Sequence, residues 1–293
     1  MTVFSALGES GPRSWSAATS RRRQMIIVYL VGIPGAVLVL IPLLWMVSTA
    51  LKSNQAVFSI PPQVLPHSPQ WSNFRTGTNL IPFWRYGLNS LVVAGLGSVG
   101  TVLSSALVAY PLARTRAPGL TVVFVLVVGT ILLPGQVLLV SQFVIFHALG
   151  WYGTYLPLIV PSWLGGGAFN IFLLRQFFLT LPAELDQAAQ VDGAGHLRIF
   201  WRIIIPQAIP ALLAVGLLDF VSKWNDFLGP LIYLNRTSTF TLPLGLASFQ
   251  GLYSTSWNYL MADTLLAVVP CVVLYLFAQR LMVRGLVVGG TKA

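Results

Sequence analysis

Long apolar runs that lack charged side chains dominate the pattern of the chain. Residues 24–51 contain no Asp, Glu, Lys or Arg, and neither do residues 86–113. A helix needs about 20 apolar residues to cross the hydrocarbon core of a bilayer. The pattern therefore predicts membrane-spanning helices at about 25–51 and 88–113.

The uncharged stretch from residue 117 to residue 174 is too long for a single helix. Its centre holds a polar, turn-prone segment at residues 150–154 (GWYGT), which divides the stretch into two expected spans. Two later apolar runs complete a set of six. The last four expected spans lie at about 120–146, 155–175, 206–233 and 258–279.

Composition indicates a chain that lies in a lipid bilayer. Hydrophobic residues make up 56% of the 293 residues and charged residues only 8%, whereas soluble domains carry about 25% charged residues. We therefore predict an all-α integral membrane protein. The net charge of +10 does not indicate a nucleic-acid partner, because an aqueous basic patch would not come with such long uncharged runs. The single cysteine, Cys271, excludes a disulfide framework or a thiolate metal centre made by this chain alone.

Basic residues predict the orientation of the spans. If the N-terminus is cytoplasmic, twelve of the 17 Lys and Arg residues fall on cytoplasmic segments and five fall elsewhere, as the positive-inside rule requires. Both ends are then cytoplasmic. Residues 1–24, rich in Ser, Gly and Arg, are expected to form a disordered tail, and residues 285–293 a second tail. The arginines at 21–23 lead into a run too long for a cleavable signal peptide.

Three charged residues interrupt the fifth expected span. Asp219, Lys223 and Asp226 recur at i, i+4 and i+7, so a continuous helix would carry them on one stripe. A charge near the bilayer centre costs about 2.5–3.5 kcal/mol on insertion scales, so such residues usually face the bundle interior or water. The stripe is interpreted either as an ion pair that holds helices together or, with Trp224 and Asn225, as one wall of a solute path. No catalytic residues and no metal ligands are expected.

Small residues recur at helical spacing in the second span, and three consecutive glycines, 165–167, occur in the fourth. Small side chains let helices approach closely, so the stripe is interpreted as a packing surface. The glycines are interpreted in the same way, with a hinge as the alternative. The stripe consists of Ser90, Ala94, Gly97, Thr101 and Ser104.

The one long cytoplasmic loop, about residues 176–205, is expected to form two short helices. Glu184 and Asp186 favour the positive N-terminal end of the first helix. Gly193 can end it in a left-handed conformation, and Asp192 could then cap the second helix.

The second of these helices is expected to be amphipathic. Leu197, Phe200, Trp201 and Ile204 fall at i, i+3, i+4 and i+7, which predicts one apolar face suited to the membrane interface. The first helix instead presents small residues that would let a partner protein come close, although a plain helical linker would show the same periodicity. Those small residues are Ala188, Ala189, Gly193 and Ala194.

The sequence from Gln187 to Ala194, followed by Phe200 and Pro206, resembles a known family motif. It is similar to the E-A-A-x-x-D-G-A loop of permease subunits of binding-protein-dependent ABC importers. In that family the loop forms a coupling helix that lies in a cleft of a cytoplasmic ATPase. The resemblance implies the same role for this segment.

One position departs from the family pattern. Gln187 stands where the family has a glutamate that is thought to pair with a basic residue of the ATPase. The carboxylates of Glu184 and Asp186 lie within one helical turn and could substitute for it.

Further matches, in chain order over about residues 25–293, resemble the carbohydrate subfamily, in particular its maltose-permease-like second subunit. The resemblance implies a six-helix bundle of the maltose type over residues 25–284, with a cytoplasmic coupling helix. The matching segments are Trp71–Phe74, Asn89-Ser90, Ala109–Arg114, Leu133–Val137, Trp224–Asp226, Gln279-Arg280 and Arg284-Gly285.

The resemblance also implies a function and a set of partners in the bacterial cell membrane. The chain would translocate a sugar or oligosaccharide that an extracytoplasmic binding protein delivers, paired with a second homologous permease. It has no G-x-x-x-x-G-K-[ST] loop, so it would be no enzyme and would hold no cofactor, and ATP and Mg would bind a partner ATPase dimer at the cytoplasmic face. The outer loop at about 234–257 would be a connector or would reach into the binding protein.

Two alternatives are kept open. The solute could be a glycerol-phosphate derivative instead of a sugar. The chain could also be a stand-alone secondary transporter or channel, in which Asp219 and Lys223 relay protons, although no inverted repeat is evident and the cytoplasmic loop would then have no role.

Overall fold

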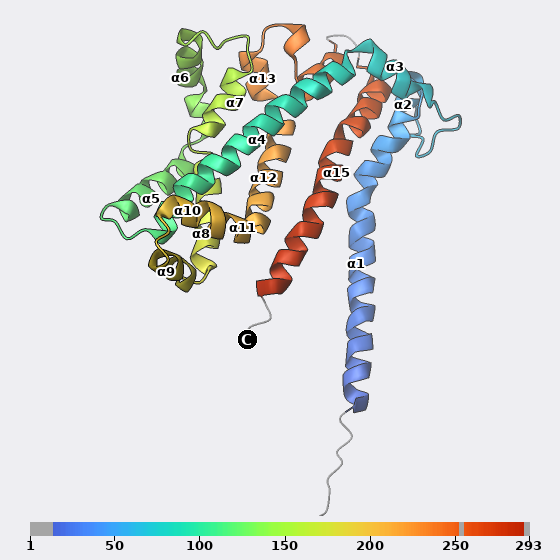
Figure 1. Cartoon of the computed structure of the whole chain (residues 1–293). Helices are drawn as coiled ribbons and strands as arrows, with labels where there is room; N and C mark the ends of the chain where they lie inside the picture. Colours follow the sequence, from blue (N-terminus) through green and yellow to red (C-terminus); the bar gives the residue numbers. More distant parts are fainter. Residues whose placement is uncertain (1–13, 252–254, 290–293) are drawn as a thin grey trace, which may run out of the picture.

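The computed structural model describes residues 14–251 and 255–289 as helices joined by turns, with one isolated β-bridge between Gln250 and Thr255. Four helical segments are long and apolar enough to cross a membrane, and the number rises to six if each of two bent helix pairs counts as one span. The architecture is therefore the helical membrane bundle that the apolar runs predict (Figure 1).

The four longer segments coincide with expected spans. They include α1 (Ser14–Ala50), α4 (Phe83–Arg114) and α15 (Trp257–Gly289). The fourth joins α7 (Leu156–Trp163) to α8 (Ala168–Thr180) across the three glycines.

The third and fifth expected spans differ from straight helices. The third consists of α5 (Leu120–Gly129) with the short η1 (Thr130–Leu132), followed after a bend of 100° by α6 (Gly135–Ala148). Pro134 stands at the break, where its missing N–H and the clash of its ring with the preceding turn do not allow the helix to continue.

The other bent pair, with an angle of 77°, leads from the cytoplasmic loop into the fifth span. Pro210 lies in the first turn after the bend, where a proline needs no hydrogen-bond partner. The helix then stops well short of residue 233, and a separate short helix follows. In order, these elements are α10 (His196–Ile199), η2 (Phe200–Ile204), α11 (Ile205–Gln207), α12 (Ile209–Trp224) and α13 (Leu228–Tyr233).

The expected tails are partly helical. α1 already begins at Ser14, so residues 14–24 extend the first helix instead of forming an irregular segment. Residues 285–289 likewise belong to α15. The remainder of both expected tails, 1–13 and 290–293, lies outside the described residues.

α4 is the central helix, and it packs against α7, α8 and α12. Every member of its small-residue stripe is buried, which confirms the stripe as a packing surface. Gly166 has a φ of +66° and lies so close to Thr101 and Ser105 that a Cβ would collide with them. The glycine segment between α7 and α8 thus serves close packing against α4.

The end of the bundle opposite the long loop is covered by short helices. α3 (Ser72–Leu80) lies between the end of α1 and the start of α15. The amide of Asn73, 6% exposed, donates to the carbonyl oxygens of Ala50 and Lys52, both at 2.8 Å. Because each buried donor is satisfied, this asparagine fixes the corner where α1 ends.

The expected outer loop at 234–257 contains η3 (Thr237–Thr239), α14 (Leu242–Leu246) and η4 (Ala247–Phe249). The Asn89 amide of α4 donates to the carbonyl oxygens of Ser238 and Phe240, at 3.1 and 2.9 Å. The first part of this loop is therefore bound to α4. Residues 252–254 of the loop lie outside the described residues.

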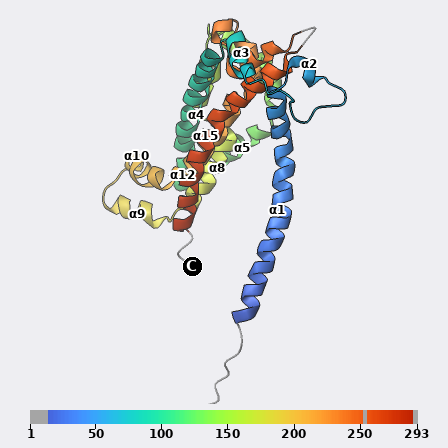
Figure 2. The same cartoon turned by 90° about the vertical axis from the view of Figure 1, so that its right-hand side faces the viewer.

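The first helix leaves a large apolar surface uncovered. In two views at right angles, α1 stands apart from the rest of the bundle except near its end at Ala50 (Figures 1 and 2). None of the most apolar window of the span Val28–Ala50 is buried. Such a surface suits lipid or a second membrane subunit.

Candidate functional site

The first candidate site is the cytoplasmic loop, whose first helix is α9 (Glu184–Val191). Gly193 has a φ of +77° and its N–H donates to the carbonyl of Gln190 at 3.0 Å, so it ends the helix as predicted. The prediction for Asp192 as a cap is wrong, because α10 starts after Gly195 and no side chain caps it.

The loop is tied to the end of α4. Arg114 Nε lies 3.5 Å from Asp186 Oδ2, and Arg114 Nη2 donates to the Pro182 carbonyl at 3.3 Å. The two side chains of this ion pair are only 7% and 13% exposed. Asp186 therefore binds within the chain, which leaves Glu184 as the exposed carboxylate beside Gln187.

The small residues of the loop do not share one surface. Gln187, Ala188, Asp192 and Gly193 are exposed, whereas Ala189 is 8% exposed and belongs to the core. Ala194 packs against that core. The free face of α9 thus carries part of the motif, and the rest of the motif holds the helix in place.

The four residues of the predicted apolar face of the second loop helix differ in burial. Leu197 and Trp201 are 71% and 48% exposed, while Ile199, Phe200 and Ile204 are buried. The cause is the π-helical turn η2, whose wider i→i+5 hydrogen bonding shifts the buried face away from the α-helical period.

The loop also contacts α4 through aromatic packing. The Phe200 ring lies 5.2 Å from the Tyr110 ring, centroid to centroid. Arg175 of α8 donates from Nε to the Leu112 carbonyl at 3.0 Å and lies over the Phe124 ring. The loop, α4, α5 and α8 therefore form one packed unit.

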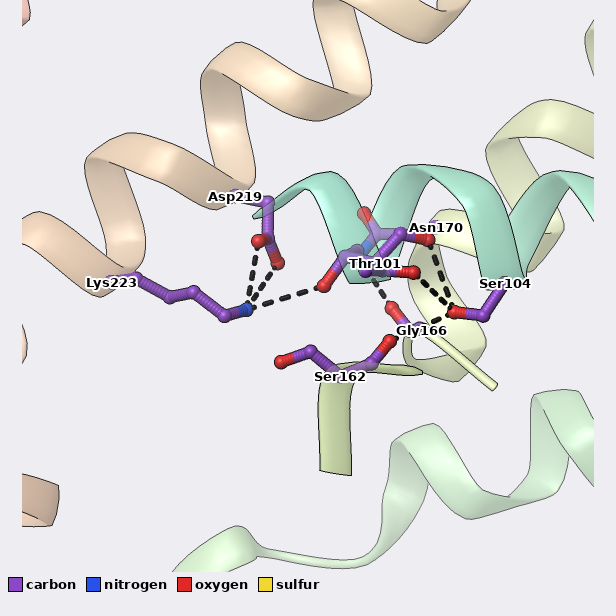
Figure 3. A network of polar contacts seen from close by, with 8 residues as sticks. Thr101, Ser104, Ser162, Gly166, Asn170, Asp219 and Lys223 are labelled. Atoms are coloured by element: carbon purple, nitrogen blue, oxygen red, sulfur yellow. Dashed lines mark hydrogen bonds and ion pairs between the residues drawn. The ribbon is translucent and has the colours of Figure 1, made fainter. Parts of the chain in front are cut away.

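The second candidate site surrounds Lys223 of α12. Its ammonium contacts both Asp219 carboxylate oxygens, at 2.8 and 2.7 Å, and the Thr101 hydroxyl at 3.3 Å (Figure 3). The lysine methylenes pass so close to Gly97 that a Cβ there would lie 2.7 Å from them. The predicted Asp219–Lys223 pair is thus confirmed, and it joins α12 to the small-residue stripe of α4.

Asp226 does not belong to the same stripe. Because α12 ends at Trp224, the i+7 relation fails, and Asp226 Oδ1 instead accepts the Gly229 N–H at 3.1 Å. This carboxylate caps the turn into α13, and the expectation that it shares one helical stripe with Asp219 and Lys223 is wrong.

Trp224 and Asn225 face a different direction from Lys223. Trp224 is 5% exposed, and its indole N–H donates to the Ala267 carbonyl of α15 at 3.1 Å. With Asn225 it lines a cavity of about 250 Å³, which does not include Lys223 or Asp226. Four of the five path candidates therefore divide between two cavities, and Asp219 is a lining residue of neither.

A larger cavity, of about 450 Å³, lies between α6, α7, α12 and α13. Lys223 and Asp226 are its charged lining residues. Sequence reasoning missed most of its polar wall, although glutamines within the apolar run of α6 were a visible signal. The missed polar lining residues are Gln136, Gln142, Ser162 and Tyr233.

The sequence and the fold agree with one family. The model for the binding-protein-dependent transport system inner membrane component matches residues 10–288, so the chain belongs to this family. It is a permease subunit of a binding-protein-dependent ABC importer.

Curated relatives resemble the chain over nearly its full length. The probable ABC transporter permease protein YurM of Bacillus subtilis (strain 168) is 34% identical over 285 residues, covering 96% of this chain and 91% of the relative. The inner membrane ABC transporter permease protein YcjP of Escherichia coli (strain K12) is 32% identical, covering 94% and 99%. The sn-glycerol-3-phosphate transport system permease protein UgpE of Yersinia pestis bv. Antiqua (strain Antiqua) is 34% identical, covering 92% and 98%.

Solved structures share the fold. A chain of a bacterial ABC transporter that imports the acidic polysaccharide alginate superposes with a TM-score of 0.74 at 23% identity, covering 89% of this chain and 97% of that one. A second alginate transporter structure, in complex with a periplasmic protein bound to an alginate pentasaccharide, gives a TM-score of 0.64 at 17% identity, covering 92% and 98%. At these identities the likeness concerns the fold alone.

Proposed function

We propose that this permease moves a solute across the bacterial cell membrane together with a second, homologous permease, and that a separate ATPase dimer drives it. The observation that supports this most is the exposed face of α9 together with its ion pair to the end of α4. A helix that a partner can reach on one side, and that is fixed to a membrane helix on the other, can transmit motion between them.

Coupling then proceeds through the loop as a rigid body. ATP and Mg bind the partner ATPase, and its closure displaces α9 on the cytoplasmic side. Arg114 and Phe200 carry that displacement to α4, which packs against α7, α8 and α12 around the polar cavity. The cavity thereby opens alternately to either side of the membrane.

The orientation follows from the basic residues. The start of α1, the end of α15 and helices α9 and α10 lie toward one end of the bundle, which we assign to the cytoplasm (Figure 1). The opposite end, with α2 (Asn54–Val57), α3 and the loop at 234–257, then faces the extracytoplasmic binding protein.

A sugar or oligosaccharide is the solute class that we propose. The match to maltose-type permeases along the chain supports it. A glycerol-phosphate solute is the second candidate, because UgpE is named for sn-glycerol 3-phosphate.

Proline substitution in the coupling loop tests the proposed partners. Gly193→Pro should release the ATPase, because proline requires a φ near −65° and has no N–H, whereas Gly193 has a φ of +77° and donates to Gln190. Gly195 has a φ of −71° and nothing near its missing Cβ, so Gly195→Pro is a matched control.

The measurement is affinity purification of the full chain from the membranes of its own host. With the unchanged chain and with Gly195→Pro, an ATP-hydrolysing protein with a phosphate-binding loop and a second permease should copurify. With Gly193→Pro, at least about tenfold less ATPase should be recovered. Purification of the unchanged chain alone, with solute transport in liposomes without ATP, would support the stand-alone transporter instead.

A further inference from the structure

We propose that the cavity between α6, α7, α12 and α13 binds the transported solute directly, and that its hydrogen-bonding groups and charge select an uncharged polyhydroxy solute over an anionic one. This inference rests on the proposed function. It assigns solute selection to the residues of this chain that line the cavity.

The lysine at the cavity edge is not available as a binding group for an anion. An ammonium has three N–H donors, and Lys223 directs them to Asp219 Oδ1, Asp219 Oδ2 and the Thr101 hydroxyl. Its charge is compensated by a carboxylate at 2.7 Å. A phosphate or uronate group would have to displace Asp219 to reach it.

The charge that remains at the cavity is negative. Of the cavity's lining residues, Lys223 and Asp226 are charged, and Lys223 already has its counter-charge in Asp219. Asp226 receives one neutral backbone N–H from Gly229 and no compensating cation in the described part of the chain. An anion in the cavity would therefore meet a like charge, and this repulsion disfavours its binding.

The other polar groups of the cavity suit hydroxyl groups. A carboxylate can accept several hydrogen bonds, and Asp226 uses one oxygen for Gly229. Gln136 and Gln142 are exposed and offer amides that both donate and accept. A polyol presents donors and acceptors together, so it can satisfy such a mixed set, whereas an anionic group offers acceptors only.

Tyr233 provides an independent sign that the cavity has a binding role. Its side chain is 4% exposed and lines the cavity, yet its hydroxyl has no hydrogen-bond partner in the described structure. Phe143 and Phe146 pack against its ring and hold it in position. A buried hydroxyl without a partner is costly, and a solute hydroxyl would satisfy it.

The size of the cavity agrees with this assignment. Small-molecule sites usually measure about 300–1,000 Å³, and this cavity measures about 450 Å³. The apolar cavity of about 430 Å³ between α4, α12 and α15 has a similar size, but its lining includes Ser98 as its one hydroxyl residue and no charged or amide side chain. Hydroxyl-rich solutes match the first cavity and not the second.

The test uses the whole transporter, with this chain, its copurifying partners and its binding protein, in proteoliposomes. Two mixtures are offered separately, one of neutral mono-, di- and trisaccharides and one of sn-glycerol 3-phosphate with uronic-acid oligosaccharides. Imported solute is measured by mass spectrometry, and ATP hydrolysis is measured in parallel. The unchanged transporter should import from the neutral mixture and not from the anionic one.

Two cavity variants then test the residues. Asp226→Asn and Gln142→Ala should each lower the solute imported per ATP about tenfold, the usual effect of losing one good hydrogen bond to a ligand. Stimulation of the ATPase by the loaded binding protein should persist, because both residues lie far from α9 along the chain and in the fold. Gln176→Ala, an exposed glutamine of α8 outside the cavity, is the matched control and should change neither value.

Three results would overturn the proposal: import from the anionic mixture, import from neither mixture with a stimulated ATPase, or an unchanged import-to-ATP ratio in both variants. The proposed function fails in a different way. In that case the binding protein does not stimulate ATP hydrolysis even in the unchanged transporter.

Discussion

At the scale of single residues, the Asp219–Lys223 ion pair allows two charged side chains to lie inside the membrane bundle. Both side chains are largely buried, at 10% and 21% exposure. Removing one partner of a buried pair leaves the other charge uncompensated, which costs more than replacing both. The contribution of this pair to the stability of the protein can therefore be measured by substitution, without a transport assay.

Single replacements should destabilise the protein more than the double replacement does. We expect Lys223→Met and Asp219→Asn each to lower the free energy of unfolding by about 3 kcal/mol, because each leaves one buried charge alone. The double variant, which carries neither charge, should recover most of this loss. Thermal unfolding of the detergent-solubilised chain measures it, and equal Tm values for the unchanged protein and both single variants would contradict the prediction.

Sequence reasoning succeeded for residues related by a regular helix and failed where the helix ends. The i, i+4 spacing of Asp219 and Lys223 predicts their contact, and the structure confirms it. Asp226 was misplaced because the helix stops at Trp224, and neither a proline nor a glycine at residues 224–227 announces that stop. The same turn, which the sequence did not predict, also brings Tyr233 of α13 to the cavity.

At the scale of helices, the cytoplasmic loop is informative because it is joined to the bundle at named points. Its terminating glycine followed from the sequence, since left-handed C-terminal glycines have a strong local signal, whereas only Ala188 and Gly193 of the four predicted small residues are exposed. The π-helical turn had no such signal, and it separates the exposed Leu197 and Trp201 from the buried Phe200 and Ile204. The bend at Pro134 was readable from the proline, but its angle of 100° depends on packing.

The ion pair between α4 and α9 should be required for coupling. Arg114→Ala leaves the poorly exposed Asp186 without its cation, so α9 should be held less firmly, and the solute imported per ATP should fall about tenfold. Arg116→Ala, an exposed arginine just beyond α4, is the matched control.

Import and ATP hydrolysis by the reconstituted transporter provide the measurement for this pair. Arg114→Lys should recover part of the loss, because lysine restores the positive charge but lacks the planar guanidinium group of arginine. Equal import-to-ATP ratios for Arg114→Ala and Arg116→Ala would show that α9 transmits motion by another route.

At the scale of the whole molecule, the distribution of charge and apolar surface determines how the chain lies in the membrane. The apolar runs alone predicted which segments cross, because lipid requires about 20 apolar residues per helix. They did not predict which polar groups share a cavity. That depends on two bends and on helices far apart in the sequence, as with Gln142 and Tyr233.

The assigned orientation predicts that a reagent outside the cell reaches one end of the bundle and not the other. Gln55 of α2 and Ala117, just beyond α4, are both exposed and lie toward opposite ends of the bundle. With Cys271 replaced by serine, each of Gln55→Cys and Ala117→Cys gives the chain a single thiol. The chain is expressed without its ATPase, so that no partner covers the cytoplasmic end.

A membrane-impermeant maleimide should label Gln55→Cys in intact spheroplasts, because positive residues retain the other end of the bundle in the cytoplasm. Ala117→Cys should be labelled only after the membrane is permeabilised. Labelling of Ala117→Cys in intact spheroplasts would reverse the orientation. It would then place α9 where no ATPase can reach it, and the coupling mechanism and the assignment of the binding-protein side would fail together.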